Sequence, residues 1–306
     1  MSWEAIGAAG TLLGALGMLA PPTDAQPTPE RSAASVSWQR LDFRAKKLLW
    51  TATTEVELTW PATEALADEL LETPEGTGLP PRLPVALLTT RSAFAGRSDQ
   101  VELWFGSDTG RALQRRKVRF GSKAYLKTYR FTADGVFSHR VSPTEDERGL
   151  EQDSWSQVED SSIPQAPDRC SRVTEPTALL YTLTAAKLEV GDRLELCTFS
   201  NKRTQRVVVR VEECVPLEVD HRLVEHGGTA ARRRGTIETL RVRIAPADPE
   251  NEGFEFLGME GAIDLFVDLE HRLPVRLEGR LGALGRLRVE LDAAHLAEPN
   301  PSATRP

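Results

Sequence analysis

The sequence predicts a mainly β protein built on one strongly curved antiparallel sheet, a half-barrel or open barrel of about eleven strands, with one or two short helices. Apolar and polar residues alternate in segment after segment, which is the period of a strand. Turn sequences such as Ala133-Asp134-Gly135 join neighbouring segments. Nearly every segment has one polar face, so no layer of helices covers it, and the other face must be buried against itself or against a ligand.

The first predicted strand is the longest. It covers residues 48–60, where Trp50, Val56, Leu58 and Trp60 share one face while Thr and Glu residues fill the other. At roughly 3.3 Å per residue this run spans about 40 Å, about twice the length of a typical strand. The pattern raises the question of what covers the apolar face.

The segments that follow predict a helix and then a series of antiparallel strands. Residues 61–71 indicate a short helix, because Pro61 starts it and Leu66 and Leu70 follow at helical spacing. Strands are predicted at 85–94, 100–106, 110–120, 124–131 and 136–141. Residues 142–169 carry eight acidic side chains against two Arg and show little periodicity, which predicts a surface loop.

The second half of the chain is the more regular half. Residues 175–188 predict a short helix, residues 196–213 a hairpin, and residues 236–245, 262–270 and 285–293 three strands. The inward-facing residues of these three strands are Leu240, Val242, Ile244, Ile263, Leu265, Val267, Leu269, Leu287, Val289 and Leu291.

The composition and the two ends of the chain limit the kinds of protein that this sequence can be. The 306 residues, 40% of them hydrophobic, are enough for a substantial core, and the net charge of −7 argues against generic nucleic-acid binding, which needs a basic surface. The apolar run at residues 5–20 predicts an export signal, with an uncleaved N-terminal anchor as the alternative, and no other segment is long enough to span a membrane. We expect a signal peptide at 1–25, a flexible linker at 26–37, one β domain at 38–295, a disordered tail at 296–306 and a periplasmic location.

Three cysteines, Cys170, Cys197 and Cys214, leave the redox state open. One disulfide and one free thiol are compatible with an oxidising compartment. A turn near residues 201–204 places a residue near 207 opposite Cys197, so reach disfavours a bridge from Cys197 to Cys214. A bridge from Cys170 to Cys214 stays open, and the alternative is that the cysteines are small buried hydrophobic residues.

No motif predicts catalysis. Residues 106–110, GSDTG, contain the Asp-Thr-Gly of aspartic proteases around Asp108, but those enzymes need two such aspartates, and this chain has one; a polar hairpin turn is therefore expected. His221 and His226 lack the spacing of a helical zinc pair, and histidines in solvated loops are expected. We predict no enzymatic activity, no metal and no cofactor. The five histidines are His139, His221, His226, His271 and His295.

Three basic clusters lie at or near predicted turns, at residues 114–119 (QRRKVR), 201–206 (NKRTQR) and 230–235 (AARRRG). One interpretation is a docking patch for anionic lipid head groups or for another envelope protein, in particular through Arg232, Arg233 and Arg234. The other is solvated charge that keeps strand edges from aggregating.

The apolar inner face is the remaining candidate site. It either packs as a core or lines a cavity for a hydrophobic ligand, as small barrels and half-barrels do. The candidate ligand-binding residues are Trp50, Val56, Leu58, Trp60, Leu103, Val242, Ile244, Leu265 and Val267.

The second half also resembles the bacterial domain-of-unknown-function family 3108, which pairs a short Leu-Tyr helix before a Gly-Asp strand with a late D-x-E-x-R-x-P-V hairpin. The resemblance implies an exported envelope protein with a curved antiparallel sheet, similar to the half-barrels that carry lipoproteins and shelter acyl chains on their concave face. The matching residues are Ala178, Leu179, Tyr181, Gly191, Asp192, Asp268, Glu270, Arg272, Pro274, Val275 and Gly285.

Together these observations predict a non-enzymatic periplasmic protein that binds a lipid or another hydrophobic ligand on its concave face. The alternative is a structural or interaction module with a filled core and no small ligand, whose work is done by its rim loops.

Overall fold

The computed structural model describes residues 36–47, 50–74, 78–82, 84–94, 96–121, 123–164, 170, 172–248, 253–282 and 285–298. The predicted signal peptide and most of the predicted linker and tail lie outside these residues. Within them, the predicted fold class is confirmed: the chain forms one large curved sheet, mostly antiparallel, with two short α-helices.

The sheet contains sixteen strands among the described residues, more than the eleven predicted. Their bounds are β1 Trp38–Lys47, β2 Trp50–Thr59, β3 Val85–Phe94, β4 Arg97–Gly106, β5 Ala112–Arg119, β6 Tyr125–Phe131, β7 Gly135–Ser142, β8 Gln157–Pro164, β9 Val173–Thr174, β10 Arg193–Ser200, β11 Arg203–Val224, β12 Ala230–Pro246, β13 Glu255–Phe256, β14 Met259–Asp268, β15 Pro274–Arg280 and β16 Arg286–Leu296. The helices are α1 Leu66–Glu69 and α2 Ala178–Ala185, with single 3-10 turns at Thr63–Ala65 and Gln152–Ser154.

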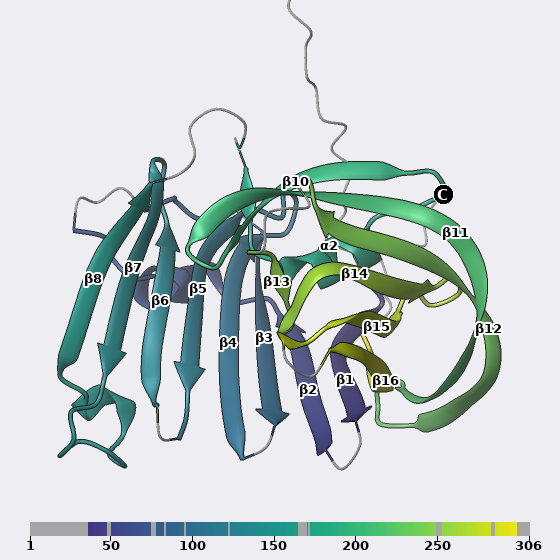
Figure 1. Ribbon diagram of the computed structural model, residues 1–306, viewed down its shortest axis with the longest axis horizontal. Helices are drawn as coiled ribbons and strands as arrows, with labels where there is room; N and C mark the ends of the chain where they lie inside the picture. Colours follow the sequence, from purple (N-terminus) through teal and green to yellow (C-terminus); the bar gives the residue numbers. More distant parts are fainter. Residues whose placement is uncertain are drawn as a thin grey trace, which may run out of the picture.

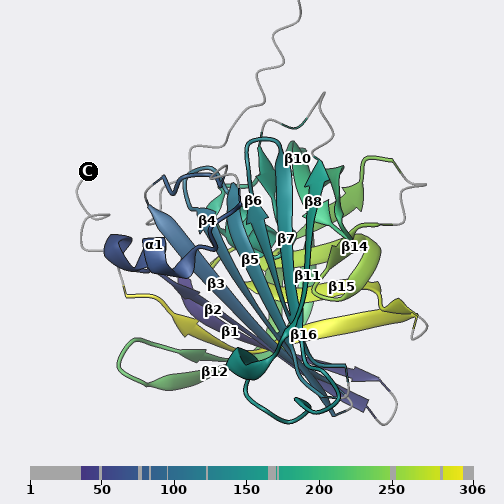
Figure 2. The ribbon, with the colours of Figure 1, turned by 90° about the vertical axis from the view of Figure 1, so that its left-hand side faces the viewer.

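Strands β1 to β8 follow one another edge to edge in chain order and form the open flank of the sheet (Figures 1 and 2). Each is antiparallel to the next, so the β1–β2, β3–β4 and β5–β6 turns lie along one end of the sheet. β8 is the outer edge, and its residues are exposed almost throughout. This flank is therefore a meander of hairpins with one free edge.

The other flank closes on itself. From β1 the sheet continues through β16, β15, β14 and β12 to β11, and the far end of β11 returns to pair in parallel with β16, Arg222 opposite Ala293. Figure 1 shows the long β11–β12 hairpin bending round to β16. Strands β11, β12, β14, β15 and β16 thus form a ring joined edge to edge.

Helix α2 lies inside the curve of the sheet (Figure 1), and all eight of its residues are buried. Its neighbours are core side chains; Phe105 of β4, for example, meets the ring of Tyr181 edge-on at 5.2 Å between centroids. A helix that is apolar all round is a buried helix. α2 therefore fills the concave side of the sheet where the two flanks meet.

Several predicted boundaries were wrong. The strand predicted at residues 48–60 is shorter, since β2 covers Trp50–Thr59, and the strand β1 before it was not predicted. The acidic segment 142–169 contains β8, and Leu269, predicted inward, is 46% exposed because it follows the end of β14. The GSDTG segment forms the turn between β4 and β5, as predicted.

The cysteines pair differently from the options that the sequence left open. Cys170 and Cys197 form a disulfide with a Cα–Cα distance of 5.6 Å, while Cys214 is a free, exposed thiol. Arg206 lies opposite Cys197 in the β10–β11 ladder, so the sequence argument against a bridge from Cys197 to Cys214 was correct. The partner was missed because β9 brings the chain alongside β10 by a parallel pairing, Val173 opposite Cys197.

Candidate functional site

The nine predicted ligand-binding residues fall into two groups. Trp50 and Trp60, at the two ends of β2, are 52% and 46% exposed. The other seven are buried in the main hydrophobic core: Val56, Leu58, Leu103, Val242, Ile244, Leu265 and Val267. These seven side chains pack against other core residues, including those of α2.

The two exposed tryptophans each contact another aromatic ring. Trp50 lies 5.9 Å from Phe94 between ring centroids, and Trp60 lies 6.4 Å from Tyr181. None of the nine predicted residues lines any of three clefts that are formed by described residues.

The largest of these clefts is polar and basic, with a volume of about 590 Å³. We call it the basic cleft. Its wall is the inner face of strands β3 to β7, and facing that wall are the β10–β11 turn, the β13–β14 turn and the residues before α2. It is lined by Thr90, Ser92, Asp99, Val101, Arg115, Lys117, Arg119, Tyr125, Lys127, Tyr129, Arg140, Glu175, Thr177, Phe199, Ser200, Asn201, Lys202, Glu255, Leu257 and Gly258.

Strand alternation explains why basic side chains of one strand line the basic cleft. On β5, Arg115, Lys117 and Arg119 line the cleft, whereas Arg116 between them pairs with Glu102 on the other face. Lys202 reaches the cleft from the β10–β11 turn, whose residues Asn201 and Lys202 both have positive φ. Two of the three basic clusters seen in the sequence therefore meet in one place.

Asp99 organises one end of the cleft. Its carboxylate lies 3.0 Å from Lys117 Nζ and 2.9 Å from Arg119 Nε. Burial favours the neutral acid, but hydrogen bonds from Arg119 and Lys117 outweigh it and hold the pKa of Asp99 below its ordinary value. Asp99 is therefore ionised and holds two bases in position.

Glu175 connects the floor of the cleft to α2. One of its carboxylate oxygens lies 3.1 Å from Arg115 Nε, and the other accepts a hydrogen bond of 2.7 Å from the backbone N–H of Thr177, just before the helix. The Glu175 side chain is only 7% exposed. Arg115 is thus held by a buried anion, and its guanidinium lies 6.0 Å from the centre of the Tyr129 ring.

Lys127 is the least compensated base in the cleft. Its Nζ lies 4.7 Å from the centre of the Tyr129 ring, and within the described part of the chain neither Lys127 nor Lys202 forms an ion pair. Burial, and then the charge of Arg140, lower the pKa of Lys127, while burial raises the pKa of Tyr129. An anion bound beside Lys127 would oppose this lowering, because a nearby negative charge favours the charged lysine.

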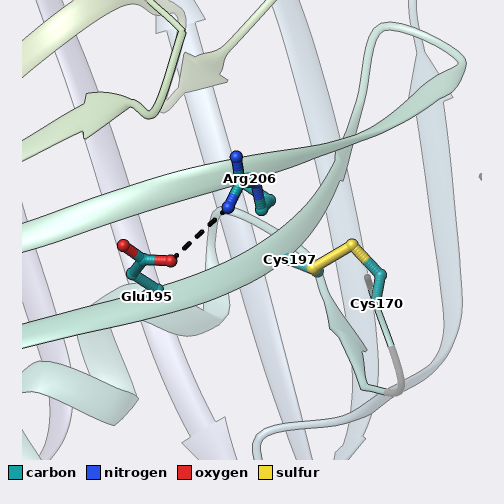
Figure 3. The surroundings of a disulfide bond; sticks show 4 residues. All are labelled: Cys170, Glu195, Cys197 and Arg206. Carbon is teal, nitrogen blue, oxygen red and sulfur yellow. Dashed lines mark ion pairs between the residues drawn. A yellow bond between two sulfur atoms is a disulfide. The ribbon is translucent and has the colours of Figure 1, made fainter. Parts of the chain in front are cut away.

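The disulfide braces the wall that faces the sheet. Figure 3 shows Cys170 joined to Cys197 on β10, with the ion pair of Glu195 and Arg206 beside it. Two residues beyond Cys197, Phe199 lines the cleft and meets Tyr129 edge-on at 5.1 Å. The cross-link therefore lies close to a residue that shapes the cleft.

The third basic cluster serves a different purpose. Arg232 pairs with Asp220 at 2.6 Å, and Arg233 pairs at 2.6 Å with Asp268, whose side chain is 1% exposed. Asp268 also accepts hydrogen bonds from the backbone of the β14–β15 turn. Arg232 and Arg233 are thus engaged within the chain, on the closed ring.

His221 lies on β11, opposite Arg233, and is 2% exposed, so the expectation that the histidines lie in solvated loops is wrong for it.

The arrangement attracts anions. Six cationic side chains against three acidic ones line the basic cleft, and guanidinium and ammonium groups donate charge-assisted hydrogen bonds to carboxylates, phosphates and sulfates. The sequence prediction included the β5 and β10–β11 bases but missed Tyr125, Lys127, Tyr129 and Arg140. The alternation of Tyr125, Lys127 and Tyr129 along β6 was the available signal, and nothing in the sequence placed it opposite Lys202.

No family model, no curated protein and no solved structure matches the chain, so its similarity to family 3108 stays a prediction. Within the described residues, no helix is long and apolar enough to cross a membrane, and no group of three His, Cys, Asp or Glu side chains has the arrangement of a metal site.

Proposed function

We propose that the protein is a non-enzymatic binding protein whose ligand is anionic and polar and sits in the basic cleft. The observation that carries this proposal is the set of six cationic side chains around one cleft, with Lys127 and Lys202 left unpaired among the described residues. A volume of about 590 Å³ fits the usual range of about 300–1,000 Å³ for small-molecule sites.

Two of the three carboxylates in the cleft support binding over catalysis. Asp99 and Glu175 are both held in ion pairs with bases of the same cleft. A carboxylate that acts as a general base must be free to take a proton near neutral pH. These two acids instead position cations, which suits a site that recognises charge.

An exported protein is the setting that we propose for this activity. The disulfide between Cys170 and Cys197 supports it, because disulfides persist in oxidising compartments and are rare in the cytosol. Export fits the apolar run at residues 5–20.

Isothermal titration with citrate and with pyrophosphate at low ionic strength tests the proposal. We expect saturable binding that weakens with added salt, and a loss of about tenfold or more in affinity for Lys127→Met, since hydrogen bonds between charged groups are the strong ones. The control is Lys46→Met, an exposed lysine of β1 that lines none of the three clefts. Affinity that is undetectable, or unchanged by Lys127→Met, contradicts the proposal.

A lipid or another hydrophobic ligand is the second candidate, and the exposed Trp50, whose ring contacts the half-buried Phe94, favours it. Native mass spectrometry of protein purified from an envelope fraction without detergent tests it. A discrete added mass that organic extraction releases as lipid supports this candidate. A bare chain mass that stays unchanged after incubation with cell lipids contradicts it, and the filled-core alternative then stands.

A further inference from the structure

A second cleft continues the basic cleft toward the turn end of the open flank. Its volume is about 490 Å³, and it is lined by Arg119, Gly121, Lys123, Ala124, Tyr125, Arg140, Pro143, Arg148, Gly149 and Trp155. Three of these residues, Arg119, Tyr125 and Arg140, also line the basic cleft. The two clefts therefore share a wall.

Tyr125 stands at the junction, and two guanidinium groups contact its ring. Arg119 lies 5.2 Å and Arg140 5.3 Å from the centre of its ring. Such cation–π contacts hold both cations against the ring at fixed positions. The junction thus presents two cationic side chains against one aromatic ring, and all three residues line both clefts.

The chemistry of the second cleft is also that of an anion site. Arg119, Lys123, Arg140 and Arg148 supply four cationic side chains, and its described lining residues include no carboxylate. Arg140 and Arg148 have exposed acidic neighbours at longer distances, Glu159 at 3.4 Å and Glu145 at 3.6 Å, which are weak pairs in water. The half-buried Trp155 adds a second aromatic plane, and its indole N–H donates to the carbonyl of Leu150.

We propose that the two clefts form one track for a linear acidic saccharide, whose carboxylates meet the bases while its sugar rings lie against Tyr125 and Trp155. This inference rests on the proposed function and extends it, because it names the class of ligand and a second subsite. Arginine forks match carboxylates, and aromatic planes suit the C–H faces of sugar rings. A nucleic acid is the less favoured polyanion, because the chain as a whole carries a charge of −7.

Titration of the full chain with galacturonic acid and its oligomers of two to six units tests the track. We expect affinity to rise with length until both clefts are filled and then to level off. Arg148→Glu, which alters only the second cleft, should weaken the hexamer by about tenfold or more and leave the monomer unchanged. Lys127→Glu, in the basic cleft, should weaken both, while Lys46→Glu, the same charge change outside either cleft, should weaken neither.

The outcomes separate this inference from the proposed function. If the monomer and citrate bind but the hexamer binds no tighter, or if Arg148→Glu has no effect on the hexamer, the track is wrong and the basic cleft stands. If no anion binds at all, both are wrong. A single-stranded oligodeoxynucleotide with the same number of charges that binds as tightly as the hexamer overturns the saccharide class. Thermal melts of each variant confirm that it is folded.

Discussion

The inner faces of strands β5–β6 and strands β12–β14 belong to one sheet and alternate in the same way, yet they end in opposite states. On β14, Ile263 and Leu265 are completely buried in the core. On β5, Arg115 and Lys117 occupy the corresponding inward positions. Burying an unpaired charge is strongly unfavourable, so a wall of bases stays open to solvent where a wall of Leu and Ile closes. Inward side chains therefore decide where this curved sheet is a core and where it is a cleft.

The largest effect should come from the closed region. Leu265→Ala removes a completely buried side chain, and we expect unfolding in urea to show a loss of about 2–5 kcal/mol. Leu269→Ala, just beyond the same strand and 46% exposed, should change stability by less than about 0.5 kcal/mol. Equal small losses in both variants would mean that β14 does not pack a core.

Loss of the disulfide between Cys170 and Cys197, on the wall that faces the cleft, should lower the free energy of unfolding. Replacing Cys170 and Cys197 together by Ser opens a cross-link spanning 27 residues, and we expect a loss of about 2–4 kcal/mol under oxidising conditions. Cys214→Ser is the matched control, since that thiol is free. If the double variant and the control unfold at the same urea concentration, the two cysteines are not joined in the folded protein.

Removing a charged side chain from the cleft, unlike removing a core side chain, should not lower the stability of the fold. Burial, then the charge of Arg140, lower the pKa of Lys127, so folding disfavours its charged form. That penalty is fully present below the folded-state pKa and is relieved as the pH rises toward the unfolded value of about 10.4. Lys127→Met should therefore leave the melting temperature at pH 7 unchanged or slightly higher while anion affinity falls. A clear drop in melting temperature would show that Lys127 supports the fold.

The smallest expected effect is a change in how stability depends on pH, and it comes from the buried His221 in the ring of strands β11, β12, β14, β15 and β16. Burial, then the charge of Arg233, lower the pKa of His221; Asp268 and Asp220 oppose them, and His271 adds to the lowering. The protein should thus lose stability as the pH falls below about 6.5, the unfolded value. His221→Gln should flatten this acid slope in urea titrations at several pH values, whereas the exposed His226→Gln should keep it. If His221→Gln leaves this acid slope unchanged, other titrating groups cause the loss of stability at low pH.

Several parts of the fold were predictable because local pattern and tertiary environment agree. Val242 and Ile244 alternate with Arg241 and Arg243, and the structure buries the first pair and exposes or ion-pairs the second. β8 was missed because an edge strand exposed on both faces has no apolar period to detect. His221 was misjudged because its burial depends on the β11–β12 hairpin bending round to β16, a long-range contact.

The candidate site was predictable only in part. The basic clusters around Arg115 and Lys202 are visible in the sequence, but so is the cluster at Arg232–Arg234, and the three look alike there. The clusters differ in their spatial neighbours. Arg232 pairs with Asp220 and Arg233 with Asp268. Lys202 instead lies in a cleft that five other cationic side chains line. No pattern along the chain carries that information.

By itself, the sequence determined that this protein is a curved antiparallel sheet with one apolar face, because strand alternation is a local property that survives in any register. The tertiary structure alone decided which inward residues became core and which became cleft wall, since α2 packs against apolar strands while the β10–β11 turn meets the basic face of β5 and β6. It also decided the disulfide, because a parallel pairing between β9 and β10 brings Cys170 to Cys197. Charges and thiols act through distance in space, and only the fold sets that distance.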